Sequence, residues 1–421
     1  MPPESEPRTP ARAGRALRLL LGAFGDPGHA FPIIALGCAL RDRGHEVHVQ
    51  TWKRWRADIA REGLGFAEAP EYDVFPTRGR ALKPYEAAVR AARETVPLIE
   101  RLRPHAIVAD ILTLAPALAG EVAGVPTATL VPHVHPSSAD GFPPYSLGAR
   151  MPRTAAGRGL WRALAKPVSN GLQQGRLELN GTRERLGLPL LERFHGGLSA
   201  QLCVVASFPQ LEYPRRWARH EHVVGPLFWE PPTDDVPIPA GGTPLVVIAP
   251  STSQDPEHRL LRSAIRGLDG LDVRVLGTWN RREPERPLPT ASNATVLDWI
   301  PYSRTMPHAD VVVCHGGHGT VVRALASGAA VVACPAAGDM NENAARVDWA
   351  GVGMRVPRAL VSPVTVRLAV KRALADQLMR DRAKALARWS ARHNGAARAA
   401  VLVERLARGE ELRGWDSNPQ P

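Results

Sequence analysis

The sequence predicts two doubly wound α/β domains, joined by a proline-rich linker and followed by helices. The chain has 421 residues, which is too long for one ordinary core and fits two domains of roughly 200 residues each. Short, continuous apolar runs alternate with helical patterns along it, as buried parallel strands alternate with helices in such sheets. Residues 230–244 interrupt this alternation with five prolines and two glycines, so we expect the interdomain linker there.

The first domain is expected to span residues 16–229. An apolar run at 16–23 predicts its first strand, a glycine-rich turn follows at 25–28, and a helical pattern runs over 31–43. A second apolar run at 46–51 completes a strand–helix–strand unit. Further buried strands are predicted at 105–109, 127–132 and 202–207.

The second domain is expected to span residues 245–400. Alanine, leucine and arginine with helical spacing over 363–408 predict two or three C-terminal helices. We expect a disordered tail at 1–15, and the end of a helix followed by a loose tail at 401–421. The predicted strands of this domain lie at 245–249, 273–276, 295–297, 311–314 and 330–334.

Composition restricts the classes of partner. The formal net charge of +12 fits either an anionic partner or a GC-rich bacterial genome, and we favour the second, since arginine, alanine, glycine and proline are enriched together. No basic patch is interleaved with aromatic residues, so no nucleic-acid partner is predicted. No apolar run approaches a membrane span, and the four cysteines lack metal-ligand spacing. A cytoplasmic enzyme without a metal is expected; peripheral membrane contact and oligomeric state stay open.

A glycine-rich loop with the sequence His-Gly-Gly-His-Gly-Thr occupies residues 315–320. It follows the predicted strand at 311–314 and precedes a helix expected to begin at Val321. Unpaired N–H groups and the helix dipole favour an anion there, and glycines let the backbone approach phosphate oxygens. A tight turn that uses glycine for geometry alone is the alternative. Side-chain donors at His315 and Thr320 favour the anion site, although no Walker A lysine follows.

The region 296–356 resembles the donor-binding half of glycosyltransferases that use UDP- or dTDP-sugars (family 1). The motifs are V-L-D-W-I-P-Y, H-G-G-H-G-T-V-V-R-A-L-A-S-G and P-A-A-G-D-M-N-E-N-A. G-H-x-x-P at 28–32 and R-G-H-E-V at 43–47 fit the opening of the same family, above all its bacterial members that glycosylate polyketides and other natural products, antibiotics included. The resemblance covers about residues 16–400. It implies the GT-B fold, in which two Rossmann-like domains face each other across a cleft.

The resemblance also implies where a UDP- or dTDP-sugar would bind, without a further cofactor. His315 would contact the diphosphate, Trp299 would pack near the base, Ser251 would add a phosphate contact, and Asp339 would hydrogen-bond sugar hydroxyls. Trp299 as a core aromatic and Ser251 as a helix cap are the alternatives. The implied donor-binding residues are Ser251, Thr252, Trp299, Ile300, His315, Gly316, Gly317, Gly319, Thr320, Asp339 and Met340.

Two positions depart from the family pattern. Met340 stands where the family commonly has glutamine, and methionine cannot hydrogen-bond a sugar, so either the donor is unusual, such as a deoxysugar, or the contact is absent. Arg323 stands where many relatives carry a glutamate that holds the ribose, and it is open whether this arginine reaches phosphate instead.

Transfer to a hydroxyl requires a base, and His29 is the candidate. It follows the first predicted strand, and Asp110 directly follows the apolar run at 105–109. Both residues are therefore expected at the carboxyl edge of the first sheet. A carboxylate can orient the imidazole and offset its developing charge, and the resemblance places a His–Asp pair at these positions. Either residue as a simple helix-start residue is the alternative.

The expected reaction is transfer of a hexose-type sugar to a small, apolar natural product with inversion at the anomeric carbon. His133, Phe142 and Tyr145 are the candidate acceptor contacts. A non-catalytic partner that activates a true glycosyltransferase and a sugar-nucleotide epimerase remain as alternatives. Met340 and Arg323 favour the first of these, whereas His29, Asp110 and His315 disfavour it.

Overall fold

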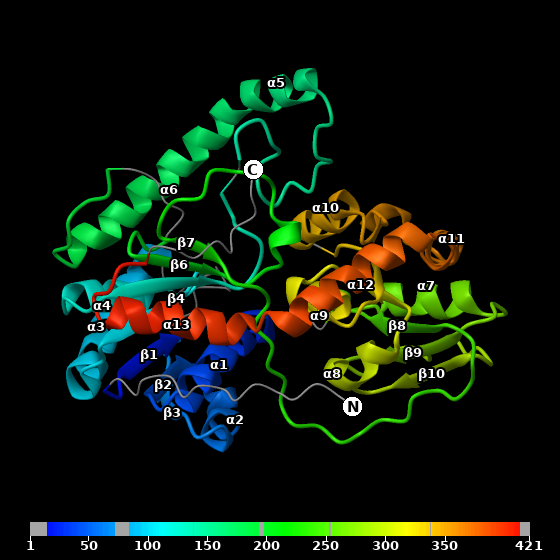
Figure 1. The fold of residues 1–421 in the computed structure, drawn as a ribbon, viewed down its shortest axis with the longest axis horizontal. Coiled ribbons are helices and arrows are strands. Elements are labelled where there is room, and N and C mark those ends of the chain that lie inside the picture. Colours follow the sequence, from blue (N-terminus) through cyan, green and yellow to red (C-terminus); the bar gives the residue numbers. More distant parts are fainter. Residues whose placement is uncertain are drawn as a thin grey trace, which may run out of the picture.

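The computed structural model describes residues 15–71, 84–137, 139–192, 198–251, 254–336 and 338–412. Over these residues the chain forms two parallel sheets, one in each half of the molecule, with helices packed against them (Figure 1). The predicted α/β class with two doubly wound domains is therefore confirmed. Thr252, residues 1–14 of the expected N-terminal tail and residues 413–421 of the expected C-terminal segment lie outside the described residues.

Seven described strands form the first sheet, in the order β3-β2-β1-β4-β5-β6-β7. The chain order reverses between β1 and β4, where Gly22 pairs with Ala109, and ligands of doubly wound sheets bind at such a switch point. The sequence does not predict β3 and β7, because both are short and neither contains an apolar run. The strands are β1 (Arg18–Gly22), β2 (Glu46–Thr51), β3 (Gly65–Glu68), β4 (Ala106–Asp110), β5 (Thr127–Val131), β6 (Leu202–Val205) and β7 (Glu221–Val223).

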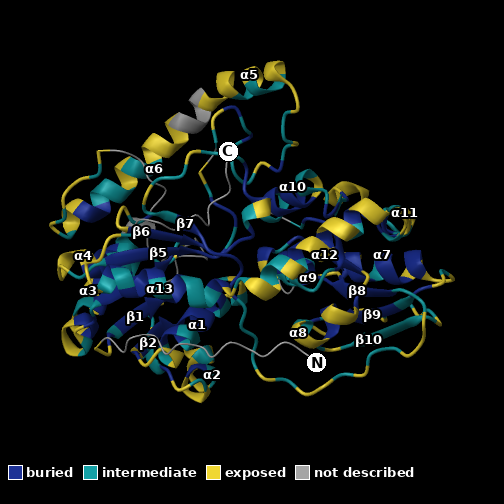
Figure 2. Cartoon of the chain, in the orientation of Figure 1, coloured by how far each residue is buried: buried dark blue, intermediate teal, exposed yellow. Residues whose placement is uncertain are grey.

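Six described strands form the second sheet, in the order β10-β9-β8-β11-β12-β13. The order reverses between β8 and β11, so the glycine-rich loop after β11 leaves this sheet at its own switch point. The inner strands of both sheets are deeply buried, whereas the edge strands β3 and β10 are only half-buried (Figure 2). The strands of the second sheet are β8 (Leu245–Ala249), β9 (Arg274–Thr278), β10 (Ala294–Leu297), β11 (Val311–Cys314), β12 (Ala330–Ala333) and the unpredicted β13 (Gly353–Arg355).

Two helices begin earlier than the sequence predicts. The helix expected from residue 31 begins at Pro27, since proline fits the first turn of a helix, and the helix expected from Val321 begins at His318. His29 therefore lies in a first helical turn. The helices before the last three are α1 (Pro27–Asp42), α2 (Arg56–Arg61), α3 (Pro84–Leu102), α4 (Leu114–Val122), α5 (Ala155–Ala163), α6 (Ala165–Arg185), α7 (Arg259–Leu268), α8 (Tyr302–Thr305), α9 (His318–Ala326) and α10 (Met340–Ala350).

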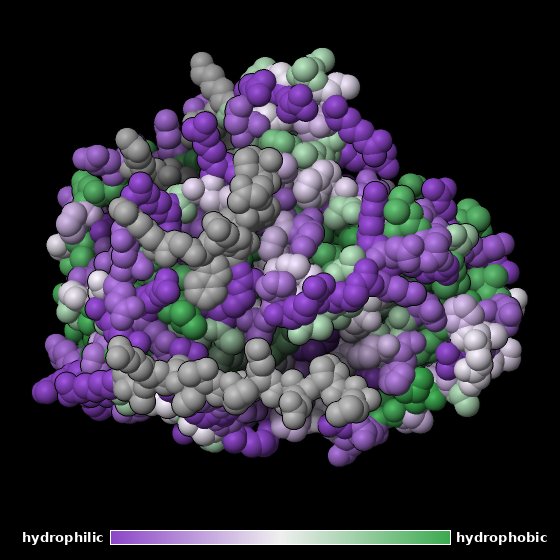
Figure 3. All heavy atoms as spheres, in the orientation of Figure 1, coloured by the Kyte–Doolittle hydropathy of each residue, from purple (hydrophilic) through white to green (hydrophobic). Residues whose placement is uncertain are grey.

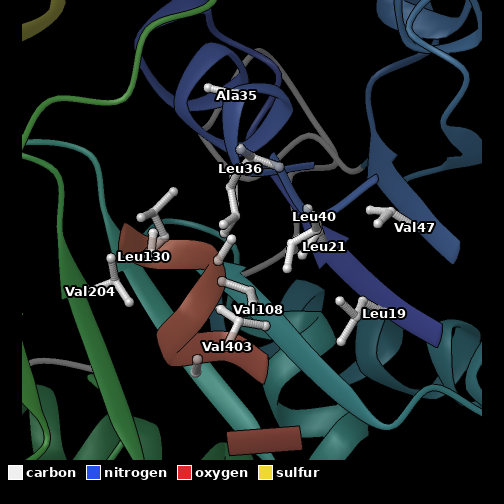
Figure 4. Close-up of a cluster of buried hydrophobic side chains, with 14 of the residues drawn as sticks. Leu19, Leu21, Ala35, Leu36, Leu40, Val47, Val108, Leu130, Val204 and Val403 are labelled. Carbon is white, nitrogen blue, oxygen red and sulfur yellow. The ribbon is translucent and has the colours of Figure 1, made fainter. Parts of the chain in front are cut away.

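Three helices follow the second sheet, as predicted: α11 (Pro363–Ala375), α12 (Gln377–Arg392) and α13 (Gly395–Ala407). The last of them returns to the first sheet. Val403 of α13 is buried in one cluster with Val108 and Leu130 of the strands and Leu36 of α1 (Figure 4). The predicted domain end at residue 400 thus falls inside a helix that packs on the first domain.

Glu404 of α13 fixes this helix to the first domain. Its carboxylate accepts hydrogen bonds from Nε and Nη2 of Arg43, at 2.6 and 2.7 Å, and from Nε2 of His45 at 2.6 Å. Burial raises the pKa of Glu404, but the hydrogen bonds from Arg43 and His45 outweigh it, so the pKa lies below its ordinary value. The carboxylate is therefore charged, buried and fully partnered.

Glu404→Gln is expected to lower the free energy of unfolding by about 1.5–3 kcal/mol at neutral pH, because it removes hydrogen bonds to a charged group. As the folded-state pKa is depressed, the stabilisation exists at neutral pH and is lost as the pH falls below about 4.5. Urea unfolding measures the difference. The exposed Glu410→Gln serves as control and should change stability by no more than about 0.5 kcal/mol. Equal stability of the two variants would contradict the expectation.

Helices α5 and α6 project from the first domain between β5 and β6 (Figure 1) and are largely exposed (Figure 2). Hydrophilic residues cover most of the face that Figure 3 shows. In the described part of the chain, no helix combines the length and the apolar character that crossing a membrane requires.

Candidate functional site

The candidate site lies where the carboxyl edges of the two sheets meet. Ala206, just after β6, accepts a hydrogen bond from Nε2 of His318, the first residue of α9, at 3.2 Å. The loops that follow the strands of the first sheet therefore contact the glycine-rich loop of the second. Side chains predicted to act on acceptor and donor come together at this junction.

His29 and Asp110 form the pair that the sequence predicts. Nδ1 of His29 lies 2.7 Å from Oδ1 of Asp110, whose other oxygen accepts a hydrogen bond from the Phe24 N–H at 3.1 Å. Asp110 is 1% exposed and ends β4, beside the end of β1. Since a carboxylate only accepts, Nδ1 carries the proton, and Nε2 of the neutral ring is left to accept one.

The pKa of His29 lies above its ordinary value of 6.5. Burial lowers this pKa, but the hydrogen bond to Asp110 and the negative charges of Asp110, Asp339 and Asp26 together outweigh the burial. Asp339 belongs to the second domain, so a charge of that domain contributes to the raised pKa of His29. A histidine with a raised pKa is a stronger base than a free imidazole.

His133 and Tyr145 lie beside this pair. The His133 ring is 6.4 Å from the His29 ring and stacks on Tyr145 at 5.5 Å between centroids. The Tyr145 hydroxyl lies 3.2 Å from Nδ1 of His133, which donates to the Val134 carbonyl at 2.7 Å. Burial lowers the pKa of His133, so its ring is neutral. Phe142 instead stacks on Tyr213, with 5.5 Å between the ring centroids.

The glycine-rich loop is tightly packed on one side and open on the other. Gly316 has φ +80°, and a Cβ there would lie 3.0 Å from the Met340 carbonyl. A Cβ at Gly317 would overlap the His315 ring, whereas one at Gly319 would meet nothing within 4 Å. The first two glycines are therefore required by packing, and Gly319 leaves room for a ligand at the N-terminus of α9. Thr320 lies in the same first turn.

Nδ1 of His315 donates to the carbonyl of Ala249, at the end of β8, at 3.2 Å. Burial lowers the pKa of His315, so the ring is neutral. Ser251 follows the same strand; its hydroxyl accepts a hydrogen bond from the Gln254 N–H at 2.9 Å, as a turn-capping serine does. Both residues thus lie at the switch point of the second sheet.

The predicted base-binding residues lie at the end of β10. Trp299 is half-buried, and the guanidinium of Arg281 lies 4.8 Å from the centre of its ring; Ile300 is buried. Arg281 and Asn280 both have left-handed backbone conformations, with φ 58° and 55°. The sequence gives no signal for Arg281, because a left-handed arginine after a strand resembles any loop residue.

Asp339 and Met340 begin α10, which packs on the glycine-rich loop. Arg323 points elsewhere: its guanidinium lies 4.5 Å from the centre of the Phe228 ring and donates to the Trp229 carbonyl at 3.4 Å. Its side chain therefore packs on the segment that enters the linker. In the described residues, no three His, Cys, Asp or Glu side chains gather in a way that could hold a metal ion.

Sequence reasoning misses a buried ionic cluster between the domains. Arg346 of α10 donates through Nε to Glu342 at 2.8 Å and through Nη1 to the Leu211 carbonyl at 2.9 Å. Its Nη1 also lies 3.5 Å from Oε2 of Glu212. The three charged side chains are at most 3% exposed. Because Leu211 and Glu212 belong to the first domain, this cluster joins the domains beside the site.

Comparison with known proteins agrees with this architecture. Residues 265–399 match the family model described as the C-terminal domain of erythromycin biosynthesis protein CIII-like proteins. The chain is 27% identical to 4'-demethylrebeccamycin synthase of Lentzea aerocolonigenes, with 92% of this chain and 99% of that protein covered. It is 29% identical to O-mycaminosyltylonolide 6-deoxyallosyltransferase of Streptomyces fradiae, with 93% and 98% covered.

Solved structures share the whole fold. The glycotransferase of kitacinnamycin superposes with a TM-score of 0.74 at 22% identity, with 93% of this chain and 99% of that one covered. The glycosyltransferase VinC, in complex with dTDP, gives a TM-score of 0.67 at 17% identity, with 93% and 100% covered. At these identities the likeness concerns the fold.

Proposed function

Since this chain is a glycosyltransferase of the GT-B fold, similar to bacterial natural-product glycosyltransferases, we propose that it moves a sugar from a UDP- or dTDP-sugar to a hydroxyl of a small, apolar natural product. The observation that carries the proposal is the 2.7 Å His29–Asp110 pair, together with the negative charge of Asp339, in the other domain, that helps to raise the pKa of His29. A base and an anion-binding helix N-terminus at one junction are what such a transfer requires.

In this reaction Nε2 of His29 removes the proton of the acceptor hydroxyl as the oxygen attacks the anomeric carbon. Asp110 holds the ring and stabilises the imidazolium that forms. The nucleoside diphosphate leaves on the opposite face of the sugar, so the configuration inverts. The N–H groups at the start of α9 and His315 receive its charge, without a metal in the step we propose.

Met340 favours a nucleotide sugar that lacks one sugar hydroxyl. The methionine side chain cannot hydrogen-bond a hydroxyl at the position where related enzymes commonly have glutamine. Met340 begins α10 and packs against Gly316 of the loop expected to hold the diphosphate. We therefore propose a dTDP- or UDP-deoxysugar as the donor. His133 and Tyr145, which border the base, are proposed to contact the acceptor.

The test is incubation of the purified chain with UDP-glucose, dTDP-glucose and dTDP-deoxysugars, each with a panel of apolar acceptors that carry hydroxyl groups. Mass spectrometry is expected to find an acceptor that has gained one sugar, and NMR should show the inverted anomeric configuration. Epimerised nucleotide sugar without acceptor product would identify an epimerase instead. No turnover of any donor, together with activation of a second glycosyltransferase, would identify an auxiliary protein.

The pH dependence of kcat/KM is expected to show an acid limb above pH 6.5, because protonated His29 cannot accept the acceptor proton and its pKa is raised. The value of kcat/KM should therefore rise with pH around the raised pKa of His29, which lies above 6.5. Asp339→Asn removes one of the negative charges that raise the pKa, so the limb should move to lower pH. A wild-type limb centred below pH 6.5, or one that Asp339→Asn leaves in place, would contradict this assignment.

A further inference from the structure

His318 is part of the loop at 315–320 that is expected to hold the diphosphate, and it lies at the contact between the two domains. It is the first residue of α9 and is 7% exposed. Its Nε2 lies 3.2 Å from the carbonyl oxygen of Ala206, in the first domain, and its Nδ1 lies 3.4 Å from Oδ1 of Asn343, on α10. One ring therefore contacts both domains.

The neighbouring amide is fixed in orientation. Asn343 is 2% exposed, and its Nδ2 donates to the carbonyl of Gly316, in the glycine-rich loop, at 3.0 Å. Since this carbonyl can only accept, the amide nitrogen must face Gly316, and the amide oxygen faces His318. Both ring nitrogens of His318 thus face oxygens that accept hydrogen bonds.

A neutral imidazole has one N–H group and can satisfy only one of these two oxygens, whereas the imidazolium has two. The charged form, however, is disfavoured by the surroundings. Burial, together with repulsion from the ring of His133, after β5, and from Arg346, on α10, lowers the pKa of His318 to about 4, although the hydrogen bonds to Ala206 and Asn343 act in the opposite direction. The ring is therefore neutral at neutral pH. Only one of its two nitrogens then carries a proton and can donate to the oxygen that it faces.

The nearest other cation is already paired with carboxylates. Arg346 is paired with Glu342 of its own helix and with Glu212 of the first domain, and His315, on the same loop, is neutral and donates to Ala249. An anion at the N-terminus of α9 would add uncompensated negative charge close to His318. In a buried site such a charge strongly favours the protonated ring.

We propose that His318 takes up a proton from solvent when a nucleoside diphosphate binds to the loop at 315–320, and that the imidazolium then holds this loop to Ala206 of the first domain. The inference rests on the proposed function, since it requires a diphosphate at this loop. A charged N–H group makes a stronger hydrogen bond than a neutral one. Binding of the nucleoside diphosphate would therefore tighten the contact between the domains. The proton returns to solvent when the diphosphate leaves. His318 is thus a positioning residue that also adds positive charge near the leaving group.

The experiment is isothermal titration calorimetry of dTDP and UDP in two buffers of different ionisation enthalpy, which gives the number of protons bound per nucleotide. The wild-type chain is expected to take up more protons than His318→Gln, with a difference approaching about one at neutral pH. Glutamine keeps a donor for Ala206 but cannot be protonated. Asn343→Leu, which keeps the histidine and removes the oxygen facing Nδ1, should also reduce the uptake.

Protonation of the nucleotide itself cancels in these differences, because each variant meets the same ligand. His308→Gln, at an exposed histidine of the second domain, should match the wild type. Binding with equal proton numbers in wild type, His318→Gln and Asn343→Leu would overturn the inference and leave the proposed function intact. Absence of binding by the wild type with either nucleotide would overturn both.

Discussion

Replacing His29 with alanine is expected to reduce kcat about 10²–10⁴-fold, the range that general-base catalysis typically contributes. The acceptor hydroxyl would have to lose its proton to water, because among the described residues no other histidine is paired with a buried carboxylate beside Asp339 and the glycine-rich loop. Nucleotide affinity should stay unchanged, since His29 belongs to the first domain. Initial rates of product formation and calorimetric titration with dTDP measure the two quantities separately.

A double variant makes this test sharper. If His29 and Asp110 act as one unit, Asp110→Asn should also reduce kcat strongly, and His29→Ala combined with Asp110→Asn should be little slower than His29→Ala alone. His308→Ala, at an exposed position, is the control and should retain full activity. An undiminished rate for His29→Ala, or rate losses that multiply in the double variant, would show that another group is the base.

The sequence could predict the His29–Asp110 pair because each residue follows a buried apolar run. Ends of parallel strands gather at one edge of a sheet, and β1 and β4 are neighbours in the observed order. The glycine-rich loop was predictable for the same reason. The exact starts of α1 and α9 were not, because Pro27, His318 and Gly319 have loop-like composition but lie within first helical turns.

Contacts between the two halves of the molecule could not be predicted. His318 and Ala206 are 112 positions apart, and their residue types do not indicate a pair. Arg346 and Glu342 have the spacing of an ordinary surface ion pair, and only the packing of α10 on Leu211 and Glu212 buries them. The helical spacing of α13 could be recognised in the sequence, but the sheet on which this helix packs could not. The spacing of apolar residues indicates which face of a helix or strand is buried, but it does not indicate which other element packs against that face.

The buried cluster around Arg346 gives the second large expected effect. Arg346→Met is expected to lower the free energy of unfolding by about 3–5 kcal/mol, because it leaves Glu212 and Glu342 buried without their cation. The arginine also lies 3.4 Å from the centre of the Tyr213 ring, and methionine keeps part of that packing. Urea unfolding measures the loss. Limited proteolysis should cut the variant faster in the helix-free and strand-free segment 224–244, because the domain contact is weakened.

Two comparisons separate the ionic contribution from packing. Arg372→Met removes the 3.7 Å pair between the exposed Arg372 and the half-buried Asp376, and should cost no more than about 1 kcal/mol. The triple variant Glu212→Gln, Glu342→Leu, Arg346→Met removes every charge of the cluster and should recover most of the loss, since buried ion pairs rarely exceed neutral packing in net stability. If Arg346→Met costs no more than Arg372→Met, the cluster does not hold the domains together. If the triple variant regains the stability that Arg346→Met loses but has no activity, the charges of the cluster serve to position α10, and hence Asp339, relative to His29.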